Sequence, residues 1–228
     1  MSSKPGEGGG VVVVPSGWNI DIDRYINPFI RSPRKQNLPP AIARFLGYRD
    51  HPPRLFGNVL IIAYAFIGTL SSLSLIYAVS NQIQALGIGT DSPLILGSFG
   101  AAAVLEFYAI DSPFSQPRNV LVGQLGSSLI AVSINKGFAQ LPLRQYTQLR
   151  WLAGSLSCAC ATVFMGITGT IHPPAGATAL LATTDDNIIH LGWALIPRVL
   201  LGCCLMLVVA LIINNIQRAF PAYWWTAE

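Results

Sequence analysis

Charged residues become rare in this chain after residue 54. Eight of the fourteen Lys and Arg residues lie before residue 55. Over the whole sequence 11% of the residues are charged and 52% are hydrophobic, whereas a soluble domain carries about 25% charged residues. A stretch of this composition cannot provide a soluble surface, so we predict an all-α integral membrane protein.

The apolar part of the chain divides into long and short segments. Four are long enough to cross a bilayer, which takes about 20 residues: 55–79, 117–138, 151–170 and 191–213. Two shorter apolar segments lie between them, near 93–107 and 172–184. If the short segments also crossed, the basic loop at 136–150 would lie outside, against the positive-inside rule. We therefore predict four transmembrane helices plus two short re-entrant half-helices, with the N-terminus and the C-terminus cytosolic.

The chain is expected to have three parts. Residues 1–17 are rich in Gly, Ser and Pro and are predicted to form a disordered N-terminal tail. Residues 18–54 combine basic, aromatic and proline residues, which favours a basic interfacial segment on the membrane surface, with an irregular tail as the alternative. Residues 55–226 form the transmembrane domain. The sequence predicts a multi-pass membrane protein and does not distinguish the plasma membrane from an organelle membrane.

Two stretches of the transmembrane domain resemble two later ones. The run Gly100-Ala-Ala-Ala-Val-Leu matches Gly176-Ala-Thr-Ala-Leu-Leu, and Pro117-Arg-Asn-Val-Leu-Val-Gly matches Pro197-Arg-Val-Leu-Leu-Gly. Small residues also match by chance in membrane helices. If the match is a duplication, the helices are arranged as two repeats, each a span, a short small-residue segment and a span that begins with Pro-Arg.

The strongest local signal is the pair Pro173-Pro174 after a Gly/Thr-rich run. Proline is favoured at the first helical position, so this pair should begin a short helix. The N-terminus of a helix carries partial positive charge. A broken helix inside a membrane is tolerated only within protein or beside a polar cavity, and many transporters bind anions at such helix ends. We therefore predict a small-anion site at the N-termini of the two half-helices.

The candidates for this site are polar or small residues near the half-helices. His172 is either a ligand or proton relay, or only a helix cap. The arginines could instead extend to the membrane interface, although a cation opposes a helix N-terminus and needs another reason to be there. Glu106 is ionisable within the membrane, and its alternative is an ion pair with Arg118. The full set is His172, Thr170, Gly176, Thr178, Ser98, Gly100, Arg118, Asn119, Arg198 and Glu106.

Two motifs together resemble a known family. His172-Pro-Pro in its Gly/Thr context, and Asp111-Ser-Pro-Phe-Ser-Gln-Pro-Arg-Asn, are similar to the HPP family of integral membrane proteins, most closely to its fungal members. The resemblance covers about residues 18–226 and implies an HPP-type transmembrane domain with four spans. A plant chloroplast member carries nitrite, so the resemblance implies transport of a small inorganic anion, with nitrite as the expected substrate. No transit peptide is evident, and a chloroplast location is not expected.

Other classes of protein fit the sequence less well. It has three histidines, no His-x-x-x-His, no Gly-x-Ser-x-Gly and no paired intramembrane carboxylates, so we expect no enzyme activity. The four cysteines do not have zinc-ligand spacing, and we expect no metal and no cofactor. The basic tract lacks the pattern of a nucleic-acid-binding motif. The expected partners are the anion, the lipid bilayer and a second copy of the chain in a homodimer. A membrane assembly or scaffold protein is the alternative function.

Overall fold

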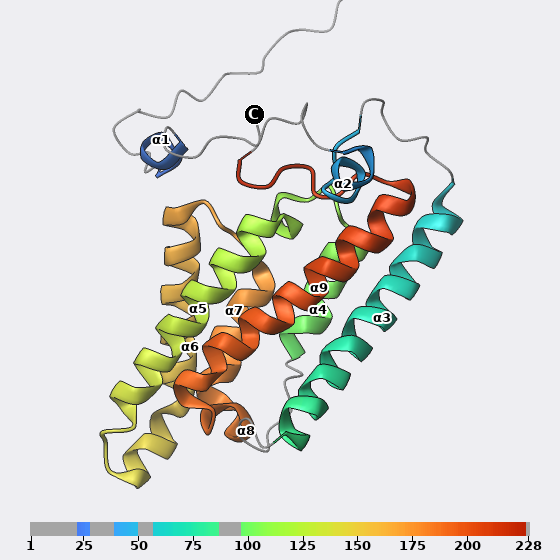
Figure 1. The fold of residues 1–228 in the computed structure, drawn as a ribbon. Helices are drawn as coiled ribbons and strands as arrows, with labels where there is room; N and C mark the ends of the chain where they lie inside the picture. The colour runs from blue at the N-terminus through green and yellow to red at the C-terminus, as the bar shows by residue number, and fades with distance from the viewer. Residues whose placement is uncertain (1–21, 28–38, 50–56, 87–96, 227–228) are drawn as a thin grey trace, which may run out of the picture.

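The computed structural model describes residues 22–27, 39–49, 57–86 and 97–226. Within these ranges the regular structure is helical, without strands (Figure 1). The predicted tail over 1–17 lies outside the described residues. The helices are α1 (Asp23–Ile26), α2 (Pro40–Phe45), α3 (Asn58–Ala85), α4 (Gly97–Phe107), η4 (Pro113–Ser115), α5 (Pro117–Phe138), α6 (Leu143–Thr168), α7 (Pro173–Thr184), α8 (Asp186–Ile189), η5 (Gly192–Ala194) and α9 (Leu195–Gln217).

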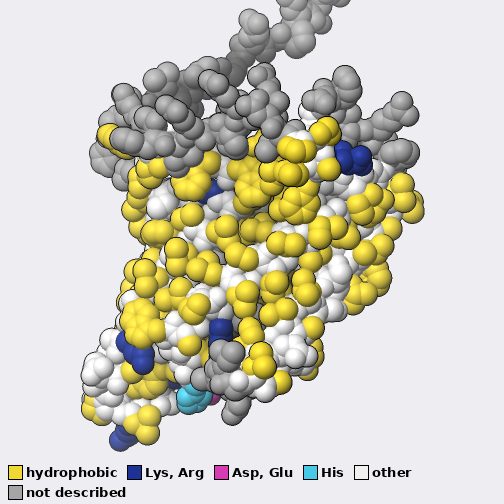
Figure 2. All heavy atoms as spheres, in the orientation of Figure 1, with side chains coloured by type: hydrophobic (Ala, Val, Ile, Leu, Met, Phe, Trp, Pro, Cys, Tyr) yellow, Lys and Arg dark blue, Asp and Glu magenta, His cyan; other side chains and the backbone are white. Residues whose placement is uncertain are grey.

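Three helical stretches in the described part of the chain are long and apolar enough to cross a membrane. They are α3, α6 and the continuous stretch of η5 and α9. Hydrophobic side chains cover most of the flank that Figure 2 shows, and Lys and Arg side chains are sparse on it. The fourth predicted span, α5, forms a helix of 22 residues. It is not among those three, since it carries polar residues such as Gln124, Ser127 and Asn135, which are buried inside the protein.

The boundaries of the helices follow from proline and glycine. Prolines occupy the first position of α5 and the first two of α7, where the lost N–H would have no partner within the helix. The helix α6 ends at Gly169, which has a φ of 62° and lies in the left-handed region. Glycine enters this region at little cost and commonly ends helices. The extended residues Thr170–His172 then lead into α7.

Side-chain contacts define the two ends of the bundle. At one end α5 begins and α6 ends, because Nη2 of Arg118 donates to the carbonyl of Thr168 over 2.8 Å. The helices α4 and α9 end there too, since Nδ2 of Asn214 donates to the carbonyl of Glu106 over 2.8 Å. At the other end α6 begins and α7 ends, because Nη2 of Arg150 donates to the carbonyl of Thr184 over 2.8 Å. The short helix α7 therefore runs from the end where α5 begins to the end where α6 begins. The short helix α4 runs in the opposite direction (Figure 1).

This course differs from the predicted re-entrant arrangement, which is not confirmed. A re-entrant segment returns to the side from which it enters, whereas α7 starts near the beginning of α5 and ends beside the beginning of α6. The segments 111–116 and 185–190, expected on one outer side, lie at opposite ends of the bundle, and so do Arg118 and Arg198. Some of the charges that entered the count of loop charges also make contacts within the protein. Arg150, for example, pairs with Asp186 at 2.9 Å.

The helices pack in two groups that mix the halves of the sequence. The helix α3 packs on α4 and α9, and α6 packs on α7 and α5. We refer to these groups as the α3–α4–α9 bundle and the α5–α6–α7 bundle. Along the chain, α3, α4 and α5 run in the directions opposite to those of α6, α7 and α9 (Figure 1). Each bundle thus combines the first two helices of one half of the chain with the last helix of the other half.

Corresponding glycines hold the two bundles in similar arrangements. Gly123 ends the Val-Leu-Val-Gly run of α5, and Gly202 ends the Val-Leu-Leu-Gly run of α9. A Cβ on Gly123 would lie 3.1 Å from Cβ of His172, just before α7. A Cβ on Gly202 would overlap the ring of Phe99, near the start of α4. In both bundles a glycine thus allows the beginning of a short helix to come close.

Candidate functional site

The beginning of α7 lies inside the protein. His172, the residue before α7, lies level with Gly123, which is six residues after Pro117, or about 9 Å along the α5 axis. Its side chain is fully buried at 0% exposure. Nδ1 lies 2.8 Å from the carbonyl oxygen of Phe114. Because a carbonyl only accepts, Nδ1 carries a hydrogen, and in the neutral ring Nε2 is left as an acceptor. Nε2 has no hydrogen-bond partner among the described residues.

His172 occupies the N-cap position of α7, but its imidazole makes no capping hydrogen bond to the helix. The helix also offers fewer free N–H groups than we expected. Pro173 and Pro174 have none, and the N–H of Ala175 donates to the carbonyl of His172 over 2.9 Å. An anion near α7 would therefore depend on side-chain donors as well as on the helix dipole.

Arg118 and Asn119 hold the extended segment between α6 and α7. Nδ2 of Asn119 donates to the carbonyl of Ile171 over 3.0 Å. Besides Thr168, Arg118 also donates to the carbonyl of Trp225 over 3.3 Å, and its guanidinium lies 4.7 Å from the centre of the Trp225 ring. These contacts position the chain around His172. They also show that the first turn of α5 anchors the C-terminal tail.

The other predicted residues lie in several places. Thr170 shares a hydrogen bond of 2.7 Å with Thr168 beside Arg118. Oγ1 of Thr178 donates to Oγ of Ser98 over 2.8 Å, which joins α7 to α4. The structure thus brings His172, Thr170, Arg118 and Asn119 together and pairs Ser98 with Thr178. Gly176 lies against Cys158, Gly100 is exposed with no atom near its missing Cβ, Arg198 lies at the opposite end, and Glu106 lies in the other bundle.

Three further buried polar residues belong to the same bundle as His172. Gln124 and Ser127 of α5 and Ser157 of α6 are all 0% exposed. Their side-chain polar atoms have no hydrogen-bond partner in the described ranges. Ser127 lies one turn after Gly123, on the face of α5 that meets α7. We refer to His172, Gln124, Ser127 and Ser157 as the unpartnered polar set.

Buried polar atoms without partners are rare in proteins and call for an explanation. Inside a membrane protein their cost is higher, and such groups commonly mark a substrate or ion pathway. The sequence contained a signal for them, because the segment 117–138 has several polar residues. It did not show which of these face inward. Ser133, for example, is exposed and donates to the carbonyl of Leu129 over 2.8 Å.

Glu106 does not form the hydrogen-bonded ion pair with Arg118 that the sequence left open as the alternative to a functional role. Glu106 is 0% exposed in the last turn of α4. Neither of its carboxyl oxygens has a hydrogen-bond partner in the part of the chain that the structure describes. The positions described also contain no cluster of three His, Cys, Asp or Glu residues that could hold a metal ion.

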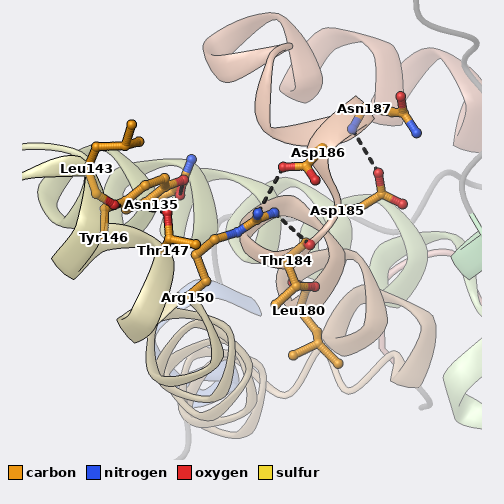
Figure 3. Close-up of polar contacts among 10 residues, drawn as sticks. All are labelled: Asn135, Leu143, Tyr146, Thr147, Arg150, Leu180, Thr184, Asp185, Asp186 and Asn187. Carbon is orange, nitrogen blue, oxygen red and sulfur yellow. Dashed lines mark hydrogen bonds and ion pairs between the residues drawn. The ribbon is translucent and has the colours of Figure 1, made fainter.

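Polar contacts close the end of the bundle opposite Arg118. Figure 3 shows Arg150 of α6 reaching both the carbonyl of Thr184 and the carboxylate of Asp186. The hydroxyl of Tyr146 donates to Oδ1 of Asn135 over 2.9 Å and ties α6 to α5. The unpartnered polar set therefore lies between two ends that are each held by an arginine.

Long apolar helices around a partly polar interior define an integral membrane protein of the polytopic helical class. Within this class the chain belongs to the HPP family, because the family's transmembrane region matches residues 55–221. Two proteins of Dictyostelium discoideum, named only as transmembrane proteins, are 35% identical over 165 residues and 33% identical over 136 residues. These alignments cover 71% and 58% of this chain, and 49% and 46% of the relatives. The chain thus spans about half the length of these relatives. No solved structure matches the chain.

Proposed function

We propose that this protein is a multi-pass transporter of a small inorganic anion, with nitrite as the first substrate to test. The observation that carries the proposal is the unpartnered polar set in the α5–α6–α7 bundle. Serine hydroxyls and the glutamine amide can donate hydrogen bonds to an anion. The serine and glutamine donors of the set would hold a small anion without a fixed positive charge, whereas Nε2 of His172 is an acceptor in the neutral ring and would not add to binding.

The order of the helices supports the same proposal. We infer that the two halves of the transmembrane domain are inverted repeats, since α3–α4–α5 and α6–α7–α9 run in opposite directions and share the Val-Leu-x-Gly run. Many transporters consist of inverted repeats with the substrate site where the repeats meet, and with short or broken helices beside the site. In this protein α7 begins just after His172, next to α5, a helix of the other half.

Three further features belong to the proposal. The N-terminus lies in the cytosol, because Arg44 and Arg49 are at the end where α3 begins and the remaining N-terminal basic residues precede it in the sequence. The protein works as a homodimer in the bilayer. It has no enzyme activity of its own.

Uptake by proteoliposomes that contain the purified protein tests this function. We expect saturable nitrite uptake, and a strong reduction in Gln124→Leu and in Ser127→Ala. Ser133→Ala is the matched control, because it removes a hydroxyl from the same helix at an exposed position. Absence of uptake by the wild type would favour a membrane assembly or scaffold protein. Equal uptake by Ser127→Ala and Ser133→Ala would exclude the unpartnered polar set as the site.

A further inference from the structure

The second bundle contains an ionisable group that the proposed anion site does not use. We propose that Glu106 binds a proton that crosses the membrane together with the anion. This inference rests on the proposed transport function and specifies its coupling ion. A carboxylate inside a membrane protein is costly unless another group neutralises it, and the oxygens of Glu106 have no hydrogen-bond partner in the described ranges.

The surroundings of Glu106 contain few groups that could neutralise it. From α9, the buried Cys203 offers a thiol, which carries no positive charge. Arg218, just after α9, donates to the carbonyl of Phe107 and to Oδ1 of Asn214, each over 2.6 Å. Arg218 also interacts electrostatically with Asp111, in the stretch that leads to η4. The helix α7 has no titratable side chain, and the nearest one on α3 is Tyr64, one turn before the Gly68 that meets Phe107.

A proton fits this site better than a metal cation does. A bound metal cation needs several oxygen ligands. The carbonyl oxygens around Glu106 are already used as acceptors, since Asn214 donates to that of Glu106 and Arg218 donates to those of Phe107 and Tyr108. A proton requires only one carboxyl oxygen of Glu106 itself.

The position of Glu106 also connects it to the anion site. Glu106 is eight residues after Ser98 on α4, or about 12 Å along the helix. Ser98 accepts a hydrogen bond from Thr178 of α7. A change of protonation at Glu106 therefore acts on a helix that directly contacts α7. One proton and one anion then cross in the same direction without net movement of charge. The carboxyl group of Glu106 binds the proton on one side and releases it on the other.

Two transport assays on the full-length protein in proteoliposomes separate this inference from the proposed function. An imposed proton gradient should drive nitrite accumulation in the wild type. Glu106→Gln, which resembles the protonated side chain, should lose this accumulation and retain exchange of labelled for unlabelled nitrite. Asp186→Asn is the matched control, because it neutralises an exposed acidic residue at the end of the bundle opposite Glu106. Wild-type uptake that ignores the gradient, or gradient-driven accumulation in Glu106→Gln, would overturn the inference.

A measurement that does not depend on transport completes the test. Infrared difference spectra of the purified protein between about pH 6, where exposed carboxyl groups are already ionised, and alkaline pH should contain the carbonyl band of a protonated carboxylic acid that is absent from Glu106→Gln. The same band in both proteins would contradict proton binding at Glu106. If Glu106→Gln does not reach the membrane, Glu106→Asp should shift the pH at which this band is half lost, and an unchanged midpoint would also overturn the inference. Failure of the proposed function appears separately, as absence of any nitrite exchange by the wild type.

Discussion

The α5–α6–α7 bundle and the α3–α4–α9 bundle have corresponding helices and different interiors. The first buries His172, Gln124, Ser127 and Ser157 without partners, whereas large apolar side chains such as Phe99, Phe107 and Met206 fill the second. The corresponding glycines show the same difference, because Gly123 faces His172 and Gly202 faces the ring of Phe99. One arrangement of helices thus supports a polar interior in one bundle and a packed apolar interior in the other.

This difference assigns separate tasks to the two bundles. The polar bundle is proposed to bind the anion, and the apolar bundle to provide a rigid support with Glu106 as its ionisable group. Contacts between α4 and α7 connect the two bundles. Experiments can test this difference between the bundles at three levels: the orientation of the helices, the packing inside each bundle, and individual polar contacts.

The largest expected effect is in thiol labelling of the two ends of the bundle, because a position is labelled either from one face of the membrane or from the other. In a cysteine-free background, Asp111→Cys and His190→Cys each place a thiol at an exposed position. We expect a membrane-impermeant thiol reagent to label the two positions from opposite faces of the membrane, since they lie at opposite ends of the bundle. Labelling of both from the same face would restore the re-entrant arrangement and contradict the inverted order of the helices.

Packing at the corresponding glycines should show the next largest effect. In Gly202→Ala the new Cβ would overlap the Phe99 ring, and overpacking of this kind typically costs about 1–3 kcal/mol. We expect a smaller loss for Gly123→Ala, whose nearest neighbours lie at 3.0 and 3.1 Å. Gly100→Ala is the control, with open space at its Cβ. Thermal unfolding in detergent should therefore rank Gly202→Ala as the least stable and leave Gly100→Ala unharmed.

The sequence predicted the helices better than their connections. Proline pairs and apolar length located α5, α6, α7 and α9, because these signals act within one segment. The course of the short helices through the bundle depends on contacts between distant segments, such as that of Arg150 with the carbonyl of Thr184, and no count of loop charges contains these contacts. Similarly, Ser127 and Ser133 look alike in the sequence. The structure shows that Ser127 is buried where α5 packs inside the bundle, whereas Ser133 lies on an exposed face of the same helix.

Arg118 tests the link between the polar bundle and the C-terminal tail. Arg118→Gln removes charged hydrogen bonds to the carbonyls of Thr168 and Trp225, and such bonds typically contribute about 1.5–3 kcal/mol each. We expect a lower unfolding temperature and a partial recovery in Arg118→Lys, which keeps the charge and loses the planar fork. The double variant with Glu106→Gln should show additive losses. Rescue by Glu106→Gln would instead reveal an ion pair between these residues.

The smallest expected effect concerns the end shown in Figure 3. The side chain of Asp186 is 77% exposed, and an ion pair this exposed contributes at most about 1 kcal/mol. Asp186→Asn should thus change the free energy of unfolding only slightly, and the difference should disappear at high salt. Arg150→Gln should cost more because it also removes the bond to the carbonyl of Thr184. Equal losses in both variants would assign the stability of this end to the ion pair.

Binding of the anion within the α5–α6–α7 bundle is the central claim, and ligand-dependent thermal stability tests it most directly. A ligand that binds only the folded state raises its stability, by about 2.7 kcal/mol at a hundred times Kd. At constant ionic strength, nitrite should raise the unfolding temperature of the wild type and of Ser133→Ala. It should have little effect on Gln124→Leu. An equal increase in Gln124→Leu, or none in the wild type, would contradict binding at the unpartnered polar set.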